Sequence, residues 1–477
     1  MKNLFWLAAA ILALNPAPGF GATSLSLDQF KEKMKKHVAS LPGQATASVE
    51  IEVLGAGNSL FSHNENGKII PASNTKLITS VLALQKLGPG YTFETKIFRS
   101  GNDLVIQGNG DPYLVSERLY LLARDVARTG IKSIDSIRVS NSAYDKIYSG
   151  LMEWDDSSEP FTAMIAPTSS NFNSIEIHLI PGEGKQPKLE LGPVPHSYAT
   201  LINEVRMVPG RGRSISVRPG KMEGDRETFR VTGTMGKGAN PATEYASVRS
   251  PESLVAHTLA SLLRQEGITV KQDFGGASYA PAKGEEIASA KSLPLLDLLR
   301  ASNTYSNNFM TEQVFLAYGA AAGGGGASIE KSRAGAKAFL DSKPGCAGAV
   351  MDNGSGLTWN NRISAKCFAE VLQGSYRDFL VFADLLGSLP VGGQTGTLRN
   401  RFKRVGPDIE PLRVRAKTGT LWSRQAVTSL VGITQTASGE KIAFALIEND
   451  QRNNPALLSA MRDWEDKCVE YIQQLKL

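Results

Sequence analysis

Ser73 and Lys76 form the first pair of residues in this sequence whose types and spacing suit catalysis. In Ser73-Asn74-Thr75-Lys76 the lysine comes three residues after the serine, so on a helix both side chains lie on one face. A serine hydroxyl is a poor nucleophile until a base takes its proton, and a lysine desolvated in a cleft can take it. The pattern predicts acyl-transfer chemistry on a serine.

Two other segments carry the same S-x-x-K pattern. Residues 328–331 begin a charged helix after a glycine tract, and residues 438–441 lie in a turn between two strands. Only Ser73 precedes a long apolar segment, residues 75–87, in which a lysine becomes half buried. A helix N-terminus also directs N–H groups at a developing oxyanion. Ser73 is therefore the predicted nucleophile.

Ser306-Asn307-Asn308 forms an S-x-N pattern. Here a second hydroxyl can pass a proton between the lysine and a leaving amine, and an amide can orient the lysine and the substrate. The same pattern occurs at residues 62–64 and 169–171. The segment 299–311 is rich in asparagine, a poor helix former, which indicates a loop or a helix break with a function. Caps and turns explain these residues equally well.

Lys417-Thr418-Gly419-Thr420 is a K-T-G-T sequence, and its K-T-G part occurs once. The preceding residues 412–415 alternate like a strand, which would place Lys417 and Gly419 on one face and Thr418 on the other. Glycine permits close approach of a ligand, while lysine and threonine can bind a carboxylate. The three motifs are specific together, in this order and local context.

Helix and strand patterns divide the rest of the chain into two kinds of region. The N-terminal and C-terminal parts combine helices with strands, whereas residues 92–285 are mostly short strands and turns. The simplest topology is one helix-and-sheet domain with a strand-rich insertion, and the tract 320–327 is predicted to be a flexible loop. The predicted helices are 27–40, 75–87, 116–128, 253–265, 295–310, 331–340, 367–376 and 455–475, and the predicted strands are 45–53, 93–99, 104–107, 137–139, 175–180, 229–232, 412–415, 427–436 and 441–447, with a short one near residue 60.

The N-terminus has the pattern of a secretory signal peptide. Lys2 precedes an apolar run at residues 4–14, and small residues at Gly19, Gly21 and Ala22 suit cleavage. No later stretch approaches about 18 uninterrupted apolar residues, so no transmembrane segment is expected in the mature chain. We expect residues 1–22 to be removed and the protein to be periplasmic.

Composition excludes several other functions. The net charge is only +6, and the densest basic patch, residues 211–221, lacks stacking aromatics, so no nucleic-acid partner is expected. Five scattered histidines form no zinc motif, and no glycine pattern for nucleotides precedes a helix; we expect neither metal nor cofactor. Of the three cysteines, Cys346 could pair with Cys367 and leave Cys468 free, but sequence does not determine the pairing.

With these motifs the sequence resembles the class C, low-molecular-mass penicillin-binding proteins, the D-alanyl-D-alanine carboxypeptidase/endopeptidase family. The resemblance covers nearly the whole mature chain and includes residues 108–114, 352–357 and 389–393, although Asn353 stands where an acidic residue or glycine is common. It implies an α+β fold with a penicillin-binding/β-lactamase-like serine transpeptidase domain, an antiparallel sheet flanked by helices, and strand-rich inserted domains. The implied divisions are 23–91 with 286–477 for the catalytic domain, 92–167 with 246–285 for one insert, and 168–245 for a second, β-rich insert.

The resemblance also implies a role for each motif residue. Ser73 would be the acyl-ester nucleophile and Lys76 its general base. Ser306 would relay protons, and Asn308 would position the substrate. The oxyanion hole would consist of the backbone N–H groups of Ser73 and Thr420.

Substrate binding is assigned to the third motif and to one arginine. Lys417 and Thr418 would bind the terminal carboxylate beside Gly419, with help from Thr420. Arg362 matches a family Asn-Arg element and would read an acidic side chain of the peptide. A surface salt bridge explains Arg362 equally well.

The implied function is hydrolysis of peptidoglycan stem peptides and cross-links by a periplasmic serine D-alanyl-D-alanine carboxypeptidase and endopeptidase. β-Lactam antibiotics would be covalent inhibitors. One alternative is a serine β-lactamase, which needs an efficient deacylating base; another is a non-catalytic module that senses penicillin or binds the wall. The sequence ranks neither carboxypeptidase against endopeptidase activity nor one oligomeric state against another.

Overall fold

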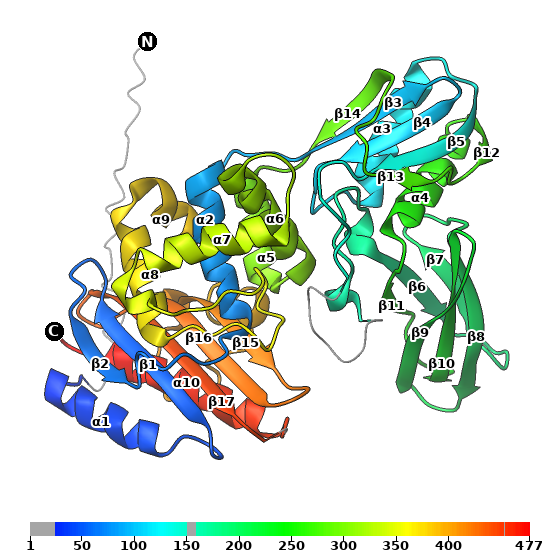
Figure 1. Ribbon diagram of the computed structural model, residues 1–477. Helices are drawn as coiled ribbons and strands as arrows, with labels where there is room; N and C mark the ends of the chain where they lie inside the picture. The colour runs from blue at the N-terminus through cyan, green and yellow to red at the C-terminus, as the bar shows by residue number, and fades with distance from the viewer. Residues whose placement is uncertain (1–23, 150–158, 453) are drawn as a thin grey trace, which may run out of the picture.

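A five-stranded sheet places the first and last strands of the chain side by side. In the computed structural model, which describes residues 24–149, 159–452 and 454–477, the strand order is β15-β16-β17-β1-β2. Strand β1 pairs antiparallel with β17, with Thr46 opposite Asn449 (Figure 1). The predicted signal peptide lies outside the described residues. The strands are β1 (Thr46–Val53), β2 (Ser59–His63), β15 (Arg415–Leu421), β16 (Ala426–Gln435) and β17 (Lys441–Asp450).

Helices cover both faces of this sheet. Strand side chains alternate between the faces, so Leu430 and Phe444 pack with α1 and α10, whereas Val431 and Ala445 pack with α2 and α8. Nearly every residue of β16 and β17 is buried for this reason. The helices of this lobe are α1 (Leu27–Ala39), α2 (Thr75–Leu87), α5 (Leu295–Tyr305), α6 (Asn308–Gly323), α7 (Ile329–Asp341), α8 (Ala365–Arg377), α9 (Phe379–Ser388) and α10 (Leu457–Gln474).

Helices α2 and α6 form the centre of the helical layer. Residues 75–84 and 309–319 are buried without interruption, and the buried residues include the polar Lys76 and Glu312. Helix α2 ends at Gly88, whose φ of 79° belongs to the left-handed region that glycine adopts freely. Its predicted bounds, 75–87, are confirmed.

The predicted single helix at 295–310 is wrong, because the chain forms two helices there. Ser306 follows the last residue of α5 and has a left-handed backbone conformation, with φ 57° and ψ 38°. The Asn307 side chain caps α6 by accepting a hydrogen bond from the Met310 N–H. The loop predicted at 320–327 begins only after Gly323, since the alanines at 320–322 favour helix. The predicted strand at 412–415 is a 3-10 turn, Pro411–Arg413, because proline has no N–H to pair; β15 begins at Arg415.

The insertion begins with a sheet that joins its two ends. Strand β14 pairs antiparallel with β3, so the chain leaves and re-enters the first lobe at neighbouring positions (Figure 1). The order is β12-β5-β4-β3-β14, with β13 also paired to β5, and helices α3 and α4 pack on this sheet. These elements are β3 (Glu94–Ser100), β4 (Asp103–Gly108), α3 (Ser116–Arg128), β5 (Ser133–Ser140), α4 (Pro251–Gln265), β12 (Thr269–Gln272), β13 (Ala277–Ser278) and β14 (Glu285–Lys291).

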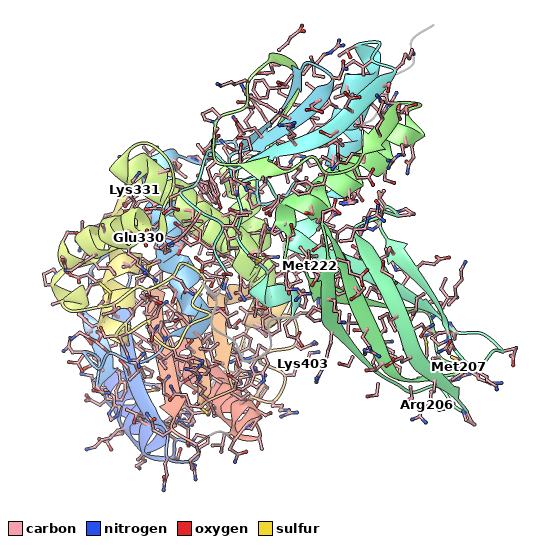
Figure 2. The ribbon with its side chains drawn as sticks, turned by 45° about the vertical axis from the view of Figure 1, so that its right-hand side comes forward. Arg206, Met207, Met222, Glu330, Lys331 and Lys403 are labelled. Atoms are coloured by element: carbon pink, nitrogen blue, oxygen red, sulfur yellow. A yellow bond between two sulfur atoms is a disulfide. The ribbon has the colours of Figure 1, made fainter. Side chains whose placement is uncertain are left out.

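Two three-stranded sheets follow within the insertion, in the orders β8-β10-β9 and β11-β6-β7, with a shared apolar core. Figure 2 shows Arg206 and Met207 at the tip of this part, far from α7. The domain boundaries remain a prediction; β14 runs across the one placed at residue 286. The strands are β6 (Ser174–Ile180), β7 (Lys188–Gly192), β8 (Ala199–Val208), β9 (Arg213–Glu223), β10 (Arg226–Gly236) and β11 (Ala242–Ser247).

The cysteine pairing that the sequence left open is resolved by the structure. Cys346 and Cys367 form a disulfide that ties a short turn to α8, and Cys468 is free and buried in α10. Among the described residues, none of the helices combines the length and the apolar character needed to cross a bilayer.

Candidate active site

Ser73 lies in a 3-10 turn, Ala72–Asn74, directly before α2 rather than within it. Ala72 has φ 47°, a left-handed conformation that costs a residue other than glycine on the order of 1–3 kcal/mol. Ala72 and Asn74 are buried, while Ser73 is partly exposed. The strained turn thus presents the serine hydroxyl at a surface.

Hydrogen bonds hold this turn against β16. The Asn74 side chain donates to Ser429 Oγ (2.7 Å), which in turn donates to the Pro71 carbonyl (2.7 Å). Thr75 Oγ1 donates to the Ala72 carbonyl (2.9 Å). The surrounding sheet therefore maintains the strained backbone beside Ser73.

Lys76 is the second residue of α2, one helical turn after Ser73, and its side-chain nitrogen contacts three groups of the site. Nζ lies 2.9 Å from Ser73 Oγ, 2.7 Å from Asn308 Oδ1 and 2.6 Å from the Ser355 carbonyl. The side chain is fully buried. Two of the three contacts therefore join residues of the first and second predicted motifs.

The environment of Lys76 favours its neutral form. Burial lowers the pKa of Lys76 well below its usual value, and the nearby positive charge of Lys417 lowers it further, while Glu312 opposes both effects. A neutral amine 2.9 Å from a serine hydroxyl has the geometry of a general base.

The second motif, Ser306-Asn307-Asn308, lies at the break between α5 and α6. The left-handed turn at Ser306 directs its hydroxyl to Lys417 Nζ, which donates to it over 2.9 Å. Asn308 is the first residue of α6, and its amide also donates to the Phe161 carbonyl of the insertion (3.2 Å). The asparagine-rich segment is thus a helix break, as one reading of the sequence predicted.

Lys417 lies on β15, the edge strand of the sheet. Besides Ser306 Oγ, its Nζ donates to the Thr418 carbonyl (2.8 Å), and burial lowers the pKa of Lys417 to about 7. The role of Gly419 in admitting a ligand stays a prediction, and the structure shows a further reason for glycine at this position. A Cβ at Gly419 would lie 2.7 Å from the Pro71 carbonyl oxygen, so its absence lets β15 pack against the turn of Ser73.

Glu312 is a part of the site that sequence reasoning missed, and the segment 352–361 was noted only in part, at residues 352–357 and without a role in the site. The buried Glu312 carboxylate accepts the N–H groups of Gly354 (3.1 Å) and Ser355 (2.6 Å), which orients the Ser355 carbonyl toward Lys76. The Asn361 amide donates to Thr75 Oγ1 (3.0 Å). A lone carboxylate within the apolar run 309–317 was the available signal.

Arg362 is not linked to the other motif residues by any contact that the structure describes. Its guanidinium donates to the carbonyls of Trp359 (2.7 Å) and Asn361 (2.9 Å), within its own turn. Its predicted role in reading an acidic side chain remains a prediction.

The two other S-x-x-K segments lie where the sequence predicted. Ser328 caps α7, and Lys331 Nζ donates to the carbonyls of Gly324 and Gly326 (both 2.7 Å). Figure 2 shows Lys331 at the periphery of the molecule. Ser438 donates to Glu440 in the turn between β16 and β17.

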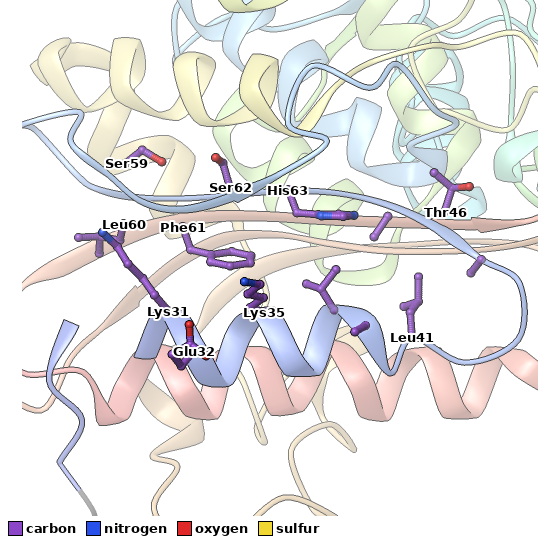
Figure 3. Close-up of a pocket in the computed structure, with 14 residues that line it drawn as sticks. Lys31, Glu32, Lys35, Leu41, Thr46, Ser59, Leu60, Phe61, Ser62 and His63 are labelled. Atoms are coloured by element: carbon purple, nitrogen blue, oxygen red, sulfur yellow. The ribbon is translucent and has the colours of Figure 1, made fainter. Parts of the chain in front are cut away.

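Two cavities differ in their position relative to the motif residues. A cavity of about 970 Å³ opens beside Ser306 and Asn308, bordered by Tyr113 and Phe172 of the insertion. A larger one, of about 1120 Å³, lies between α1 and β2, and Figure 3 shows lysines and Phe61 around it. This second cavity contains no serine–lysine pair in contact. Within the described ranges, acidic, histidine and cysteine side chains form no cluster of three suited to a metal.

Gly356 offers a test of the contact that supports the Ser73 turn. Its φ is 80°, and a Cβ there would lie 1.9 Å from the Ala72 carbonyl oxygen. We expect Gly356→Ala to displace Ser73 and to slow acylation by penicillin about a hundredfold, because small misplacements of a reacting group have effects of this size. Gly374→Ala in α8 is the control, since nothing lies within 4 Å of its Cβ position. Wild-type acylation by a folded Gly356→Ala variant would contradict the expectation.

The described geometry combines a serine, a buried lysine and two further motifs in one site, and comparison with known proteins identifies the group to which it belongs. The model of the D-Ala-D-Ala carboxypeptidase 3 (S13) family matches residues 30–468. The chain belongs to this family. The S13 match spans all three motifs and thus confirms the family, and with it the serine-type peptidase class, predicted from sequence.

Individual relatives of this S13 chain agree with the assignment. It is 28% identical over 457 residues to a D-alanyl-D-alanine carboxypeptidase of Actinomadura sp. (strain R39), covering 90% of this chain and 82% of the relative. Penicillin-binding protein 4 of Haemophilus influenzae has the same fold, with a TM-score of 0.75, 21% identity, and coverage of 91% of this chain and 98% of the other. A predatory peptidoglycan endopeptidase of Bdellovibrio bacteriovorus superimposes with a TM-score of 0.53, 17% identity, and coverage of 91% and 94%. The predicted α+β fold is confirmed.

Proposed function

We propose that the protein is a periplasmic enzyme that hydrolyses peptidoglycan peptides through an acyl-enzyme on Ser73, as D-alanyl-D-alanine carboxypeptidase and as endopeptidase. The observation that carries the proposal is the 2.9 Å contact between Ser73 Oγ and the buried Nζ of Lys76. Membership of the carboxypeptidase family supports the substrate class.

In the first half of the reaction Ser73 Oγ attacks the carbonyl carbon of the D-alanyl–D-alanine amide. Lys76 takes the hydroxyl proton as the Oγ–C bond forms. The C–N bond then breaks, and the proton passes to the leaving amine with Ser306 as relay. In the second half, water attacks the ester carbon and gives a proton to Lys76. The Oγ–C bond then breaks, and this proton passes to Ser73 Oγ.

Backbone N–H groups would stabilise the oxyanion in both halves. The Ala416 N–H donates to the Pro390 carbonyl, away from β16 (3.4 Å). Because N–H directions alternate along a strand, the Thr420 N–H points to the same free edge of β15. Together with the Ser73 N–H it is the proposed oxyanion hole.

The charged ammonium group of Lys417 would bind the terminal carboxylate of the substrate next to Thr418. The desolvated ammonium lies at the same edge as the proposed oxyanion hole and contacts the relay hydroxyl of Ser306. A carboxylate there would add a third partner to the Lys417 ammonium, besides Ser306 Oγ and the Thr418 carbonyl. Charge-assisted contacts are about twice as strong as neutral ones.

Digestion of purified peptidoglycan tests the proposal. We expect mass spectrometry to show release of free D-alanine and conversion of cross-linked dimers to monomers. Release of D-alanine alone would restrict the enzyme to carboxypeptidase activity. The absence of both products would contradict the proposal.

Penicillin should act as a slow, covalent inhibitor of this enzyme. The similar Haemophilus influenzae protein has been solved with a bound β-lactam. A long-lived adduct on Ser73 is the expected result, whereas rapid penicillin turnover would point to a β-lactamase.

The pH dependence of kcat/KM should be bell-shaped. Activity rises with pH as Lys76 loses its proton, on a limb well below pH 10.5, since burial and Lys417 lower the pKa of Lys76. It falls as Lys417 loses the charge that binds the carboxylate, from about pH 7 in the free enzyme. Bound substrate raises the pKa of Lys417, so this limb lies at higher pH in kcat.

Lys417→Arg provides the check on the alkaline limb. A guanidinium stays charged throughout the range, so the variant is expected to lose that limb while keeping the acid limb. Persistence of the alkaline limb in Lys417→Arg would assign it to another group.

A further inference from the structure

A cavity of about 550 Å³ lies beyond Thr418 and Thr420, between the edge strand β15 and helix α10. Four of its lining residues are cations and two are acids, so an anionic group is the ligand that its charge favours. The lining residues are Thr397, Asn400, Arg401, Lys403, Arg404, Thr418, Thr420, Ser459, Arg462, Asp463 and Asp466.

Most of the positive charge around this cavity already has a partner. Arg401 pairs with Glu465 (2.8 Å) and with Asp466, and Arg404 pairs with Asp463 (3.2 Å). Lys403 is exposed and donates to the Asn400 amide.

Arg462 differs from these cations. Among the residues that the structure describes, no carboxylate forms an ion pair with it, and its side chain makes one hydrogen bond there, from Nη2 to Thr420 Oγ1 (3.1 Å). Burial lowers the pKa of Arg462, an effect that Glu465 opposes, yet an arginine stays protonated in a protein. A half-buried positive charge thus lies beside the K-T-G-T motif with only a hydroxyl as a direct contact.

The threonine hydroxyls of the motif are already engaged as donors. Thr420 Oγ1 donates to the Gly419 carbonyl (2.8 Å) while it accepts from Arg462. Thr418 Oγ1 donates to Thr397 Oγ1 (2.8 Å). In this arrangement neither hydroxyl proton points to a substrate carboxylate, whereas a guanidinium has five N–H groups, of which Arg462 uses one on Thr420.

We propose that Arg462 is a further substrate-binding residue, whose guanidinium binds the carboxylate on the leaving-group side of the scissile amide, in the cavity it shares with Thr418 and Thr420. The inference rests on the proposed function, because it requires a substrate with such a carboxylate. Helix α10 brings the arginine to β15 from the C-terminal end of the chain. Arginine presents a planar fork that matches a carboxylate, so the contact selects substrates that end in a free acid.

The test compares a peptide ending in D-alanyl-D-alanine with the same peptide amidated at its C-terminus. We expect Arg462→Gln to lower kcat/KM for the acid about tenfold to a hundredfold, mostly through KM, and to leave the amide nearly unchanged. Arg462→Lys should recover part of the preference for the acid. Arg128→Gln is the charge-matched control, since Arg128 pairs with Asp125 on the exposed face of α3.

An acid-to-amide ratio that is the same in Arg462→Gln as in the wild type would overturn the inference and leave the proposed function standing. A wild type that cleaves neither peptide would contradict the proposed function instead. In that case the role of Arg462 can still be tested by comparing acylation by penicillin with acylation by its methyl ester, because only the free penicillin has the carboxylate. An equal effect of Arg462→Gln on both acylation rates would count against the inference.

Discussion

Replacing Ser73 by alanine is expected to abolish covalent labelling by penicillin and to lower peptide hydrolysis by at least about ten-thousandfold. Removal of the nucleophile from a serine hydrolase has effects of this size. The turn at Ala72–Asn74 should persist, because its hydrogen bonds are made by Asn74, Thr75 and the backbone rather than by the Ser73 hydroxyl. Mass spectrometry after incubation with labelled penicillin measures the adduct.

Ser328→Ala is the matched control for this prediction. Ser328 begins an S-x-x-K segment with the same spacing, but its hydroxyl caps α7 instead of contacting a lysine ammonium. Its loss should cost about 1 kcal/mol of stability and no labelling. Labelling of Ser73→Ala at the wild-type level would remove Ser73 from the mechanism.

Replacing Lys76 by methionine is expected to slow acylation about a hundredfold to ten-thousandfold, the usual contribution of a general base. Methionine has a similar length and fills the buried space without a charge. The variant leaves the Asn308 side-chain oxygen and the Ser355 carbonyl without the lysine donor, a loss of hydrogen bonding that opposes the gain from removing a buried amine. Stopped-flow acylation by a chromogenic β-lactam measures the rate, and thermal unfolding measures the stability.

Lys331→Met is the control for Lys76→Met, because it replaces a lysine of the same S-x-x-K spacing outside the site. Lys331 is partly exposed, and its ammonium group donates only to the carbonyls of Gly324 and Gly326 in the loop before α7. We expect unchanged acylation in this variant. If Lys76→Met kept wild-type acylation with the pH profile unaltered, another group would have to accept the serine proton.

Much of the architecture around the site follows from local sequence. The run at 75–87 is rich in apolar residues and is followed by Gly-Pro-Gly, so a buried helix with a defined end was predictable from these residues alone. The predicted break near Ser306 rested on its asparagines, although the continuous helix at 295–310 that was also predicted ignored them. Propensity cannot decide between these outcomes, because a left-handed residue such as Ser306 is stabilised by its neighbours in space, here by Lys417.

Other parts of the site have no local signature. Glu312 supports the Ser355 carbonyl across a helix–loop contact, and Arg462 reaches Thr420 from a helix near the end of the chain. The strain at Ala72 is likewise imposed by packing of β15 and Gly356 against the turn. Such features depend on residues distant in sequence.

The chemistry that begins at Ser73 was predictable from local sequence. The three motifs, in their order, carry the resemblance to the D-alanyl-D-alanine carboxypeptidase/endopeptidase family, because each motif is a short pattern whose spacing is set by one helix or one strand. Three features became visible only in the folded chain: Lys76 is buried at 2.9 Å from the serine oxygen, Lys417 contacts Ser306, and Arg462 lies next to Thr420. Distances across elements and the desolvation that lowers the pKa of a lysine arise from packing, which no local pattern of residues specifies.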